Sequence, residues 1–166
     1  LKGFQGLVHY GCEELYVSLK AWLEGGGCCL VPEVEIGHIY KDQFSYTVYP
    51  SQILYNYLFV AEVLFPTSLK CKTFALAWLR NGEAYGKALK WYKSCNEELK
   101  SCFRTFQGHD WPFVIDINRQ VSLEMEKEID RKSITLKQIV STCLNVSVHS
   151  SSCRSSVLPL TSERIS

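Results

Sequence analysis

Two prolines, Pro50 and Pro66, bracket the most apolar stretch of the chain and limit what it can form. Proline suits the first turn of an α-helix but cannot continue one, so Pro50 is placed to start a helix that runs through Val63, and Pro66 is placed to stop it. The longest apolar run in this stretch, Tyr57 to Phe65, is broken by Glu62 and is far shorter than the roughly 18 residues that a membrane span requires. The sequence therefore predicts a helix here and no membrane span in this chain.

Length and charge exclude some classes of protein. The chain has 166 residues, enough for one compact domain with a core, plus a tail. Lysine and arginine number 18 against 17 aspartate and glutamate, so the net charge of +1 gives no broad attraction for polyanions, and nucleic acid is not an expected partner. The eight cysteines form no C-x-x-C pair and follow no secretory signal, so we expect most of them to be reduced.

A helix and two strands are expected before Pro50. Between Glu13 and Leu23, apolar residues recur at the spacing of one helical face, which favours a place in the core for Trp22, and three glycines then end the helix. Cys28 to Val31 is a short apolar run, and in Val34 to Tyr40 apolar and polar residues alternate, so both predict strands. The segment from Lys41 to Pro50 has no clear period and is expected to be a loop.

The rest of the chain is expected to be helical and then disordered. Helices are predicted over about Lys72 to Leu79 and Glu83 to Phe103. Composition separates a main domain, residues 1–118, from a charged and weakly helical segment, residues 119–140. Serines dominate residues 141–166, which are expected to form a disordered tail.

The segment Tyr10 to Glu14 is the first candidate for chemistry. Two adjacent carboxylates, Glu13 and Glu14, follow Gly11 at a junction between loop and helix, where the glycine allows a substrate hydroxyl to approach one acid acting as a general base. The simpler explanation is that acidic residues in a first turn complement the helix dipole. Spacing alone is compatible with both interpretations.

Three other features also have a functional and a structural interpretation. His38, at the end of an apolar strand, could ligate a divalent metal such as Mn²⁺ or be a hydrogen-bonded structural residue. Lys41, Tyr46 and Tyr49 could hold a diphosphate and a sugar ring or belong to a solvated loop. Trp22, beside the glycines, could be a floor on which a sugar stacks, although its spacing is typical of a core residue.

Together these elements resemble the second half of the catalytic domain of the family that includes polypeptide N-acetylgalactosaminyltransferases and related bacterial family 2 glycosyltransferases. In that family a Gly-Gly-Glu or Gly-Cys-Glu-Asp element opens a helix bearing a Trp, a double glycine and two strands follow, and a Gly-His pair closes the motif. The spacing from Trp22 to His38 matches without insertion or deletion. The residues in register are Gly11-Cys12-Glu13-Glu14, Ser18, Trp22, Gly25-Gly26, Pro32 and Gly37-His38.

The resemblance implies a fold and a set of site residues. The fold is expected to be α/β, the C-terminal, acceptor-side fragment of a GT-A-type domain, helix-rich with a short strand pair. By resemblance, His38 completes a Mn²⁺ site with an Asp-x-His motif that lies earlier in the family's domain and is absent here. Glu14 corresponds to the acid that deprotonates the acceptor hydroxyl in inverting family 2 enzymes, with Glu13 beside it and with Gly11 and Trp22 at the substrate.

The match weakens along the chain. Lys41 and Tyr46 match an Arg and a Tyr of the mobile loop that closes on the nucleotide diphosphate, but Phe44 replaces a histidine and Ser45 a proline. The resemblance is good for residues 1–65, vague to residue 118, and nothing later resembles the lectin domain of the animal enzymes.

Two further expectations concern the origin of the chain. Leu58 and Phe59 stand where arginines are common in the animal enzymes, which favours bacterial relatives and a cytoplasmic location, with the Golgi lumen as the alternative if an upstream anchor exists. The chain begins at Leu1, not Met, inside an apolar-patterned segment, so upstream sequence is expected to be missing.

The function implied by the resemblance is transfer of a hexosyl or N-acetylhexosaminyl group from a UDP-sugar to an acceptor hydroxyl, assisted by Mn²⁺ in the intact parent. The expected partners are a nucleotide-sugar donor and a hydroxyl-bearing acceptor. Two alternatives stay open. One is a truncated, catalytically inactive fragment that acts only as a packing or interaction module, and the other is an all-helical regulatory domain, which the absence of a strand pair before His38 would favour.

Overall fold

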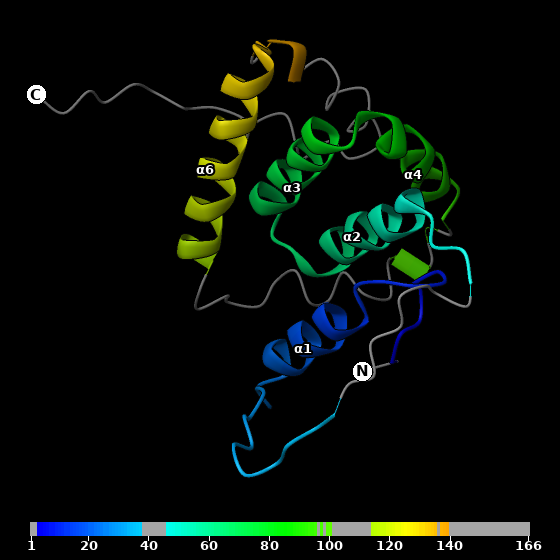
Figure 1. Cartoon of the computed structure of the whole chain (residues 1–166), viewed down its shortest axis with the longest axis vertical. Helices are drawn as coiled ribbons and strands as arrows, with labels where there is room; N and C mark the ends of the chain where they lie inside the picture. The colour runs from blue at the N-terminus through cyan, green and yellow to red at the C-terminus, as the bar shows by residue number, and fades with distance from the viewer. Residues whose placement is uncertain are drawn as a thin grey trace, which may run out of the picture.

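The computed structural model describes residues 3–37, 46–95, 97, 99–100, 114–135 and 137–139 of the chain. Within these residues the regular structure is helical (Figure 1). The helices of more than one turn are α1 (Glu13–Leu23), α2 (Pro50–Leu64), α3 (Thr67–Arg80), α4 (Gly82–Ser94) and α6 (Val114–Lys132).

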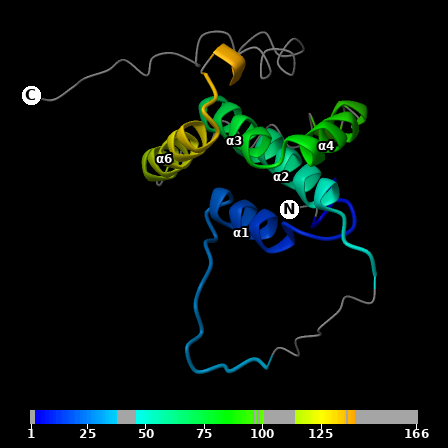
Figure 2. The same ribbon diagram turned by 45° about the horizontal axis from the view of Figure 1, so that its top comes forward.

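The centre of the helical assembly is α2. It begins at Pro50 and ends at Leu64, so the helix predicted from Pro50 through Val63 is confirmed. From Leu54 onward every residue of α2 is buried except Tyr57, which is typical of a helix surrounded by others. Helices α1, α3 and α4 all pack against it. In two views α1 lies below α2, with α3 and α4 above it (Figures 1 and 2).

A buried carboxylate joins α2 to its neighbours. Glu62 Oε2 accepts a hydrogen bond from the Tyr92 hydroxyl of α4 at 2.7 Å and lies 3.2 Å from Lys70 Nζ of α3. Both charged side chains are almost fully removed from solvent. A buried charge is tolerated when it is both paired and hydrogen-bonded, so two adjacent helices satisfy the one acid that interrupts the apolar run of α2.

Helix α6 packs along α3 and adds a second layer of contacts. Arg80, at the end of α3, pairs with Glu124 and Glu128 of α6. Helix α6 is continuous from Val114 to Lys132, so it crosses residue 118, where composition suggested a boundary. No helix in the described part of the chain is long and apolar enough to cross a membrane.

The extents of α3 and α4 differ from the sequence prediction. Helix α3 starts at Thr67, directly after Pro66, and is therefore longer than the predicted Lys72 to Leu79. The prediction that one helix continues to Phe103 is wrong, because Cys95 adopts an extended backbone conformation and α4 ends at Ser94. Residues 101–113 and the serine-rich tail lie outside the described residues.

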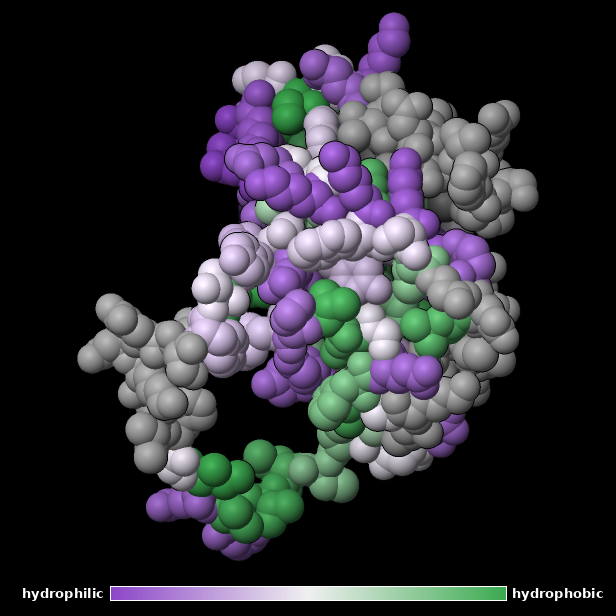
Figure 3. All heavy atoms as spheres, turned by 90° about the vertical axis from the view of Figure 1, so that its right-hand side faces the viewer, coloured by the Kyte–Doolittle hydropathy of each residue, from purple (hydrophilic) through white to green (hydrophobic). Residues whose placement is uncertain are grey.

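The predicted α/β fold with a short strand pair is wrong, because the described residues contain no strand. Residues 28–37 instead form a loop that projects away from the helices (Figure 2), and hydrophobic side chains gather on it (Figure 3). Leu30 is 89% exposed and Ile36 is 87% exposed. A strand exists only when its N–H and C=O groups pair with a neighbouring strand, and no described segment pairs with this loop. Alternating apolar residues were therefore not enough to form strands. The last residues of the predicted second strand, Ile39 and Tyr40, lie outside the described residues.

The N-terminal loop, residues 3–12, packs against α1 and α2. Gly6 has a left-handed backbone with φ of +100°, and a Cβ atom there would lie 2.1 Å from the ring of Phe59, so only glycine fits. Lys20 of α1 is fully buried and donates a hydrogen bond from Nζ to the carbonyl oxygen of Gly3 at 2.9 Å. Helix α1 therefore fixes the beginning of the loop.

One side chain of α2 fixes the end of the loop. The buried Asn56 accepts a hydrogen bond at Oδ1 from the Val8 N–H at 2.8 Å. Its Nδ2 donates to the carbonyl oxygens of Val8 at 2.9 Å and Gly11 at 2.8 Å, and lies 3.3 Å from that of Tyr10. This amide satisfies backbone groups that the loop would otherwise bury without partners.

We predict that Asn56→Ala lowers the free energy of unfolding by about 3 kcal/mol, because several buried backbone groups lose their partner together. Chemical denaturation followed by circular dichroism measures this. Asn81→Ala is the matched control: Asn81 is exposed and makes no side-chain cap to α4, so its change should stay within about 0.5 kcal/mol. Equal effects of the two substitutions would contradict the anchoring role of Asn56.

Candidate functional site

The N-terminal loop enters α1 through a sharp turn at Tyr10–Cys12. Gly11 has a φ of +104°, and a Cβ atom there would lie 3.2 Å from the Ile53 side chain of α2. Cys12, at the N-cap of α1, and His9 are also left-handed, with φ of 73° and 51°. This conformation costs a non-glycine residue about 1 kcal/mol. The Asn56 hydrogen bonds to the same turn offset that cost.

The two adjacent acids at the start of α1 have different surroundings. Both carboxylate oxygens of Glu13 lie 2.9 Å from the Gly11 nitrogen and accept its N–H. Cys12 provides no side-chain cap, so the Glu13 carboxylate stabilises the turn in its place. Glu14 is exposed and has no hydrogen-bond or ion-pair partner among the described residues. Of the two acids, Glu14 is therefore the one available to a substrate.

Three exposed tyrosines lie around this turn. The rings of Tyr10 and Tyr46 are 6.0 Å apart at an interplanar angle of 54°. Tyr57, on the exposed side of α2, lies close enough to Cys12 for each side chain to shift the pKa of the other. The exposed fraction is 40% for Tyr10, 52% for Tyr46 and 46% for Tyr57. We call Glu14 with these three tyrosines the Glu14 surface.

Electrostatic effects connect Glu14 to its neighbours. Burial raises the pKa of the Cys12 thiol to about 12, and the negative charges of Glu13 and Glu14 add to the increase. The pKa of the Tyr57 hydroxyl is also raised, first by partial burial, then by Cys12 and finally by the charge of Glu14. Both groups therefore keep their protons at neutral pH.

Trp22 lies at the other end of α1. It is 49% exposed, so the prediction that Trp22 belongs to the core is wrong. Eight residues separate it from Glu14, which is about 12 Å along a helix. A Cβ atom on Gly27 would lie 4.0 Å from the Trp22 ring, so the indole faces the glycine turn, not the Glu14 surface.

Of the sequence-predicted site, the structure joins Gly11 to Glu13, beside Glu14, and places Tyr46 against Tyr10 of the same turn. His38 and Lys41 lie outside the described residues. No group of three histidine, cysteine or acidic side chains in the described ranges could hold a metal ion. The metal role of His38 and the diphosphate role of Lys41 stay predictions.

The cysteines are found in two states. Cys12, Cys28, Cys29 and Cys95 are free. Cys71, on α3, is disulfide-bonded, although reduced thiols were expected for most cysteines. Spacing could not reveal this bond, because the chain has no C-x-x-C pair.

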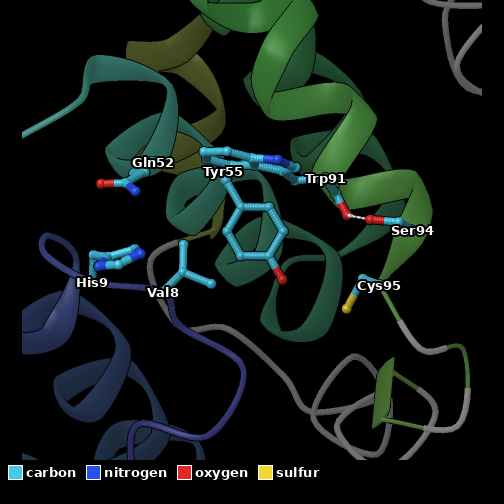
Figure 4. A pocket seen from close by; sticks show the side chains of 7 residues that line it. All are labelled: Val8, His9, Gln52, Tyr55, Trp91, Ser94 and Cys95. Atoms are coloured by element: carbon cyan, nitrogen blue, oxygen red, sulfur yellow. Dashed lines mark hydrogen bonds between the residues drawn. The ribbon is translucent and has the colours of Figure 1, made fainter.

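Sequence reasoning did not identify a pocket on the other side of the N-terminal loop. Its lining includes His9 of the loop, Gln52 and Tyr55 of α2, and Trp91 and Ser94 at the end of α4 (Figure 4). No motif joins these residues, because more than 80 positions separate His9 from Trp91. The sequence offers one weak indication of the pocket: Trp91 lies among the lysines of α4, where a large apolar side chain is expected to be exposed to solvent.

No protein-family model, no curated protein and no solved structure matches this chain. The resemblance to glycosyltransferases therefore depends on the residues of the motif alone.

We predict that Cys12 resists alkylation in the folded protein at pH 8, whereas the exposed Cys28 and Cys29 react. Burial raises the pKa of Cys12 from 9.0 to about 12, so very little reactive thiolate forms. The stability that this protonated thiol contributes is complete below pH 9 and falls as the pH rises toward 12. Iodoacetamide treatment followed by peptide mass spectrometry, with a urea-unfolded control, measures the difference. Equal labelling of Cys12 and Cys28 before unfolding would show that the turn is open.

Proposed function

We propose that the Glu14 surface is the acceptor side of a glycosyl-transfer site, with Glu14 as the general base. The observation that carries this proposal is the contrast between the two acids: Glu13 is held by the Gly11 N–H, and Glu14 is exposed among tyrosines without a partner in the described part of the chain. The motif resemblance assigns the same role to Glu14. Two independent lines of argument therefore point to one residue.

General-base catalysis requires a carboxylate within hydrogen-bond distance of the acceptor hydroxyl. The acceptor oxygen attacks the anomeric carbon of a nucleotide sugar, the bond from that carbon to the diphosphate breaks with its electron pair on the diphosphate, and Glu14 takes the hydroxyl proton. Exposed rings of Tyr10, Tyr46 and Tyr57 offer apolar faces against which a sugar ring can stack, and hydroxyls that can hydrogen-bond to it.

Rigid support for Glu14 favours this role over a solvated surface acid. Glu14 lies in the first turn of α1, whose preceding turn is fixed by the buried Asn56 amide and by Glu13. These contacts fix the backbone that carries Glu14, which limits the region that its carboxylate can reach and so favours proton transfer at one place.

We predict that Glu14→Gln lowers transfer from a UDP-sugar at least about 100-fold, because the amide cannot accept the proton. The assay uses a panel of UDP-sugars with and without Mn²⁺, on this chain and on an upstream-extended form. Glu24→Gln is the control, since Glu24 is exposed at the far end of α1 and should leave the rate unchanged. Unchanged turnover by Glu14→Gln, or no turnover of any UDP-sugar by either form of the wild-type chain, would refute the proposal.

A second candidate, an interaction module without activity, is favoured by one observation. The loop of residues 28–37 exposes Leu30, Val31, Val34 and Ile36, a set of apolar side chains that a folded chain normally covers. The lack of a strand pair in the described residues before His38 is also what an all-helical domain would show. In this case the loop is the part that binds.

We predict for this candidate that the wild-type chain associates at micromolar concentration and that a Leu30→Ser, Ile36→Ser double variant is monomeric, because apolar area drives the contact. Analytical ultracentrifugation measures both. Leu123→Ser on α6 removes a 44% exposed leucine elsewhere and should not change association. A monomeric wild-type chain that retains UDP-sugar turnover would exclude the module as the sole function.

A further inference from the structure

A pocket of about 320 Å³ lies between the N-terminal loop, the first turns of α2 and the end of α4 (Figure 4). This volume is at the lower end of the range for small-molecule sites, roughly 300–1,000 Å³. We propose that the pocket binds a neutral pyranose ring, that of a saccharide acceptor. The saccharide site is argued from the pocket itself; only its identity as an acceptor subsite rests on the proposed function.

Two aromatic rings form the walls. The Trp91 side chain is large, apolar and yet 43% exposed, and its ring centre lies 6.5 Å from that of Tyr55 at an interplanar angle of 75°. Figure 4 shows the indole lying across one side of the pocket with the Tyr55 ring below it. A pyranose ring has an apolar C–H face of matching size, so an exposed indole beside a second aromatic ring suits it.

Unpaired polar groups face the same space. The His9 imidazole, the Gln52 amide and the Trp91 indole N–H have no hydrogen-bond partner within the described ranges. Gln52 is 9% exposed and its amide atoms still reach solvent, so a ligand in the pocket could replace the water that they bind. Together these groups offer both donors and acceptors, as a ring with several hydroxyls requires.

Charge selects the class of ligand. Among the described residues that line the pocket, none is a lysine, arginine, aspartate or glutamate. A phosphate or a carboxylate would therefore be desolvated without an ionic partner. The Ser94 hydroxyl donates to the Trp91 carbonyl oxygen at 2.8 Å and keeps acceptor capacity for a ligand, and burial raises the pKa of Tyr55, so its hydroxyl stays protonated. Neutral hydroxyls are the groups that this lining can satisfy.

The backbone connects the pocket to the Glu14 surface. His9 lies five residues before Glu14, so their Cα atoms are at most about 18 Å apart. The buried Asn56 amide fixes the loop between them. An acceptor of a few sugar units could therefore reach both, with one ring in the pocket and the reacting hydroxyl at Glu14.

The experiment follows the tryptophan indole signals in a ¹⁵N-labelled full chain while methyl glycosides of glucose, galactose, N-acetylglucosamine and N-acetylgalactosamine are added. The Trp91 and Trp22 signals are assigned with Trp91→Phe and Trp22→Phe. We expect the Trp91 signal to shift and the Trp22 signal to stay. Sorbitol, an open-chain polyol, should shift Trp91 less than any glycoside. No shift with any glycoside, or an equal shift with sorbitol, overturns the proposal.

A pair of variants tests the wall directly. Trp91→Ala should weaken glycoside binding about ten-fold or more, measured by saturation-transfer NMR, because the stacking face is lost. Trp22→Ala is the matched control, since Trp22 is similarly exposed at 49%, and it should bind like wild type. Near-ultraviolet circular dichroism checks that both variants fold. If Trp91→Ala does not fold, Gln52→Ala is used as the second probe of the pocket. The proposal is overturned if a folded Trp91→Ala variant binds glycosides with wild-type affinity. If Trp91→Ala does not fold, wild-type affinity of Gln52→Ala overturns it.

Two further readouts separate this inference from the proposed function. Glu14→Gln should bind glycosides like wild type while losing transfer, and Trp91→Ala should raise the acceptor KM with little change in kcat. Glycoside binding at Trp91 without any transfer would leave the pocket assignment intact and refute the transferase. Transfer whose acceptor KM is unaffected by Trp91→Ala would refute the acceptor subsite and leave the transferase intact.

Discussion

The buried amide of Asn56 is the constraint on which the rest of the candidate site depends. Among the described residues, it is the polar side chain of α2 that hydrogen-bonds to the N-terminal loop from Val8 to Gly11. Because the amide binds backbone atoms, it fixes the path of the loop whatever side chains the loop carries. His9 and Glu14 therefore hold fixed positions at either end of one short segment, although neither touches Asn56 through its side chain.

The helices that the sequence predicted well are those with local signals. Pro50 starts α2 and paired acids start α1, and both helices form where expected. The buried face of α1 differs from the predicted face that included Trp22. Tyr16 and Lys20 are its fully buried residues, whereas Trp22 is exposed. An apolar count cannot foresee a buried lysine, because the Gly3 carbonyl oxygen that accepts its N–H becomes a neighbour only on folding, although the Tyr16 ring under its ammonium lies one helical turn earlier.

Non-local pairing explains the other differences. Residues 28–37 have the alternation of a strand, but strand formation depends on a partner that composition cannot supply. The same limit applies to the candidate site. Sequence patterns identified Gly11, Glu13 and Glu14, which lie within four residues of one another, and Tyr46 of the later loop, which the structure brings against Tyr10. The pocket of His9, Gln52 and Trp91 has no sequence signature, because three separate segments form it.

The loss of the α/β fold does not remove the chemistry proposed for Glu14. Its position is set by α1, α2 and the N-terminal loop, and none of these contacts involves residues 28–37. That loop leaves α1 at its far end, beyond Leu23, about 14 Å along the helix from Glu14. The residues proposed for donor chemistry, His38 and Lys41, follow directly after the exposed apolar loop. Glu14 and the exposed apolar loop therefore lie at opposite ends of α1, so a transfer site and an interaction surface there can be tested separately.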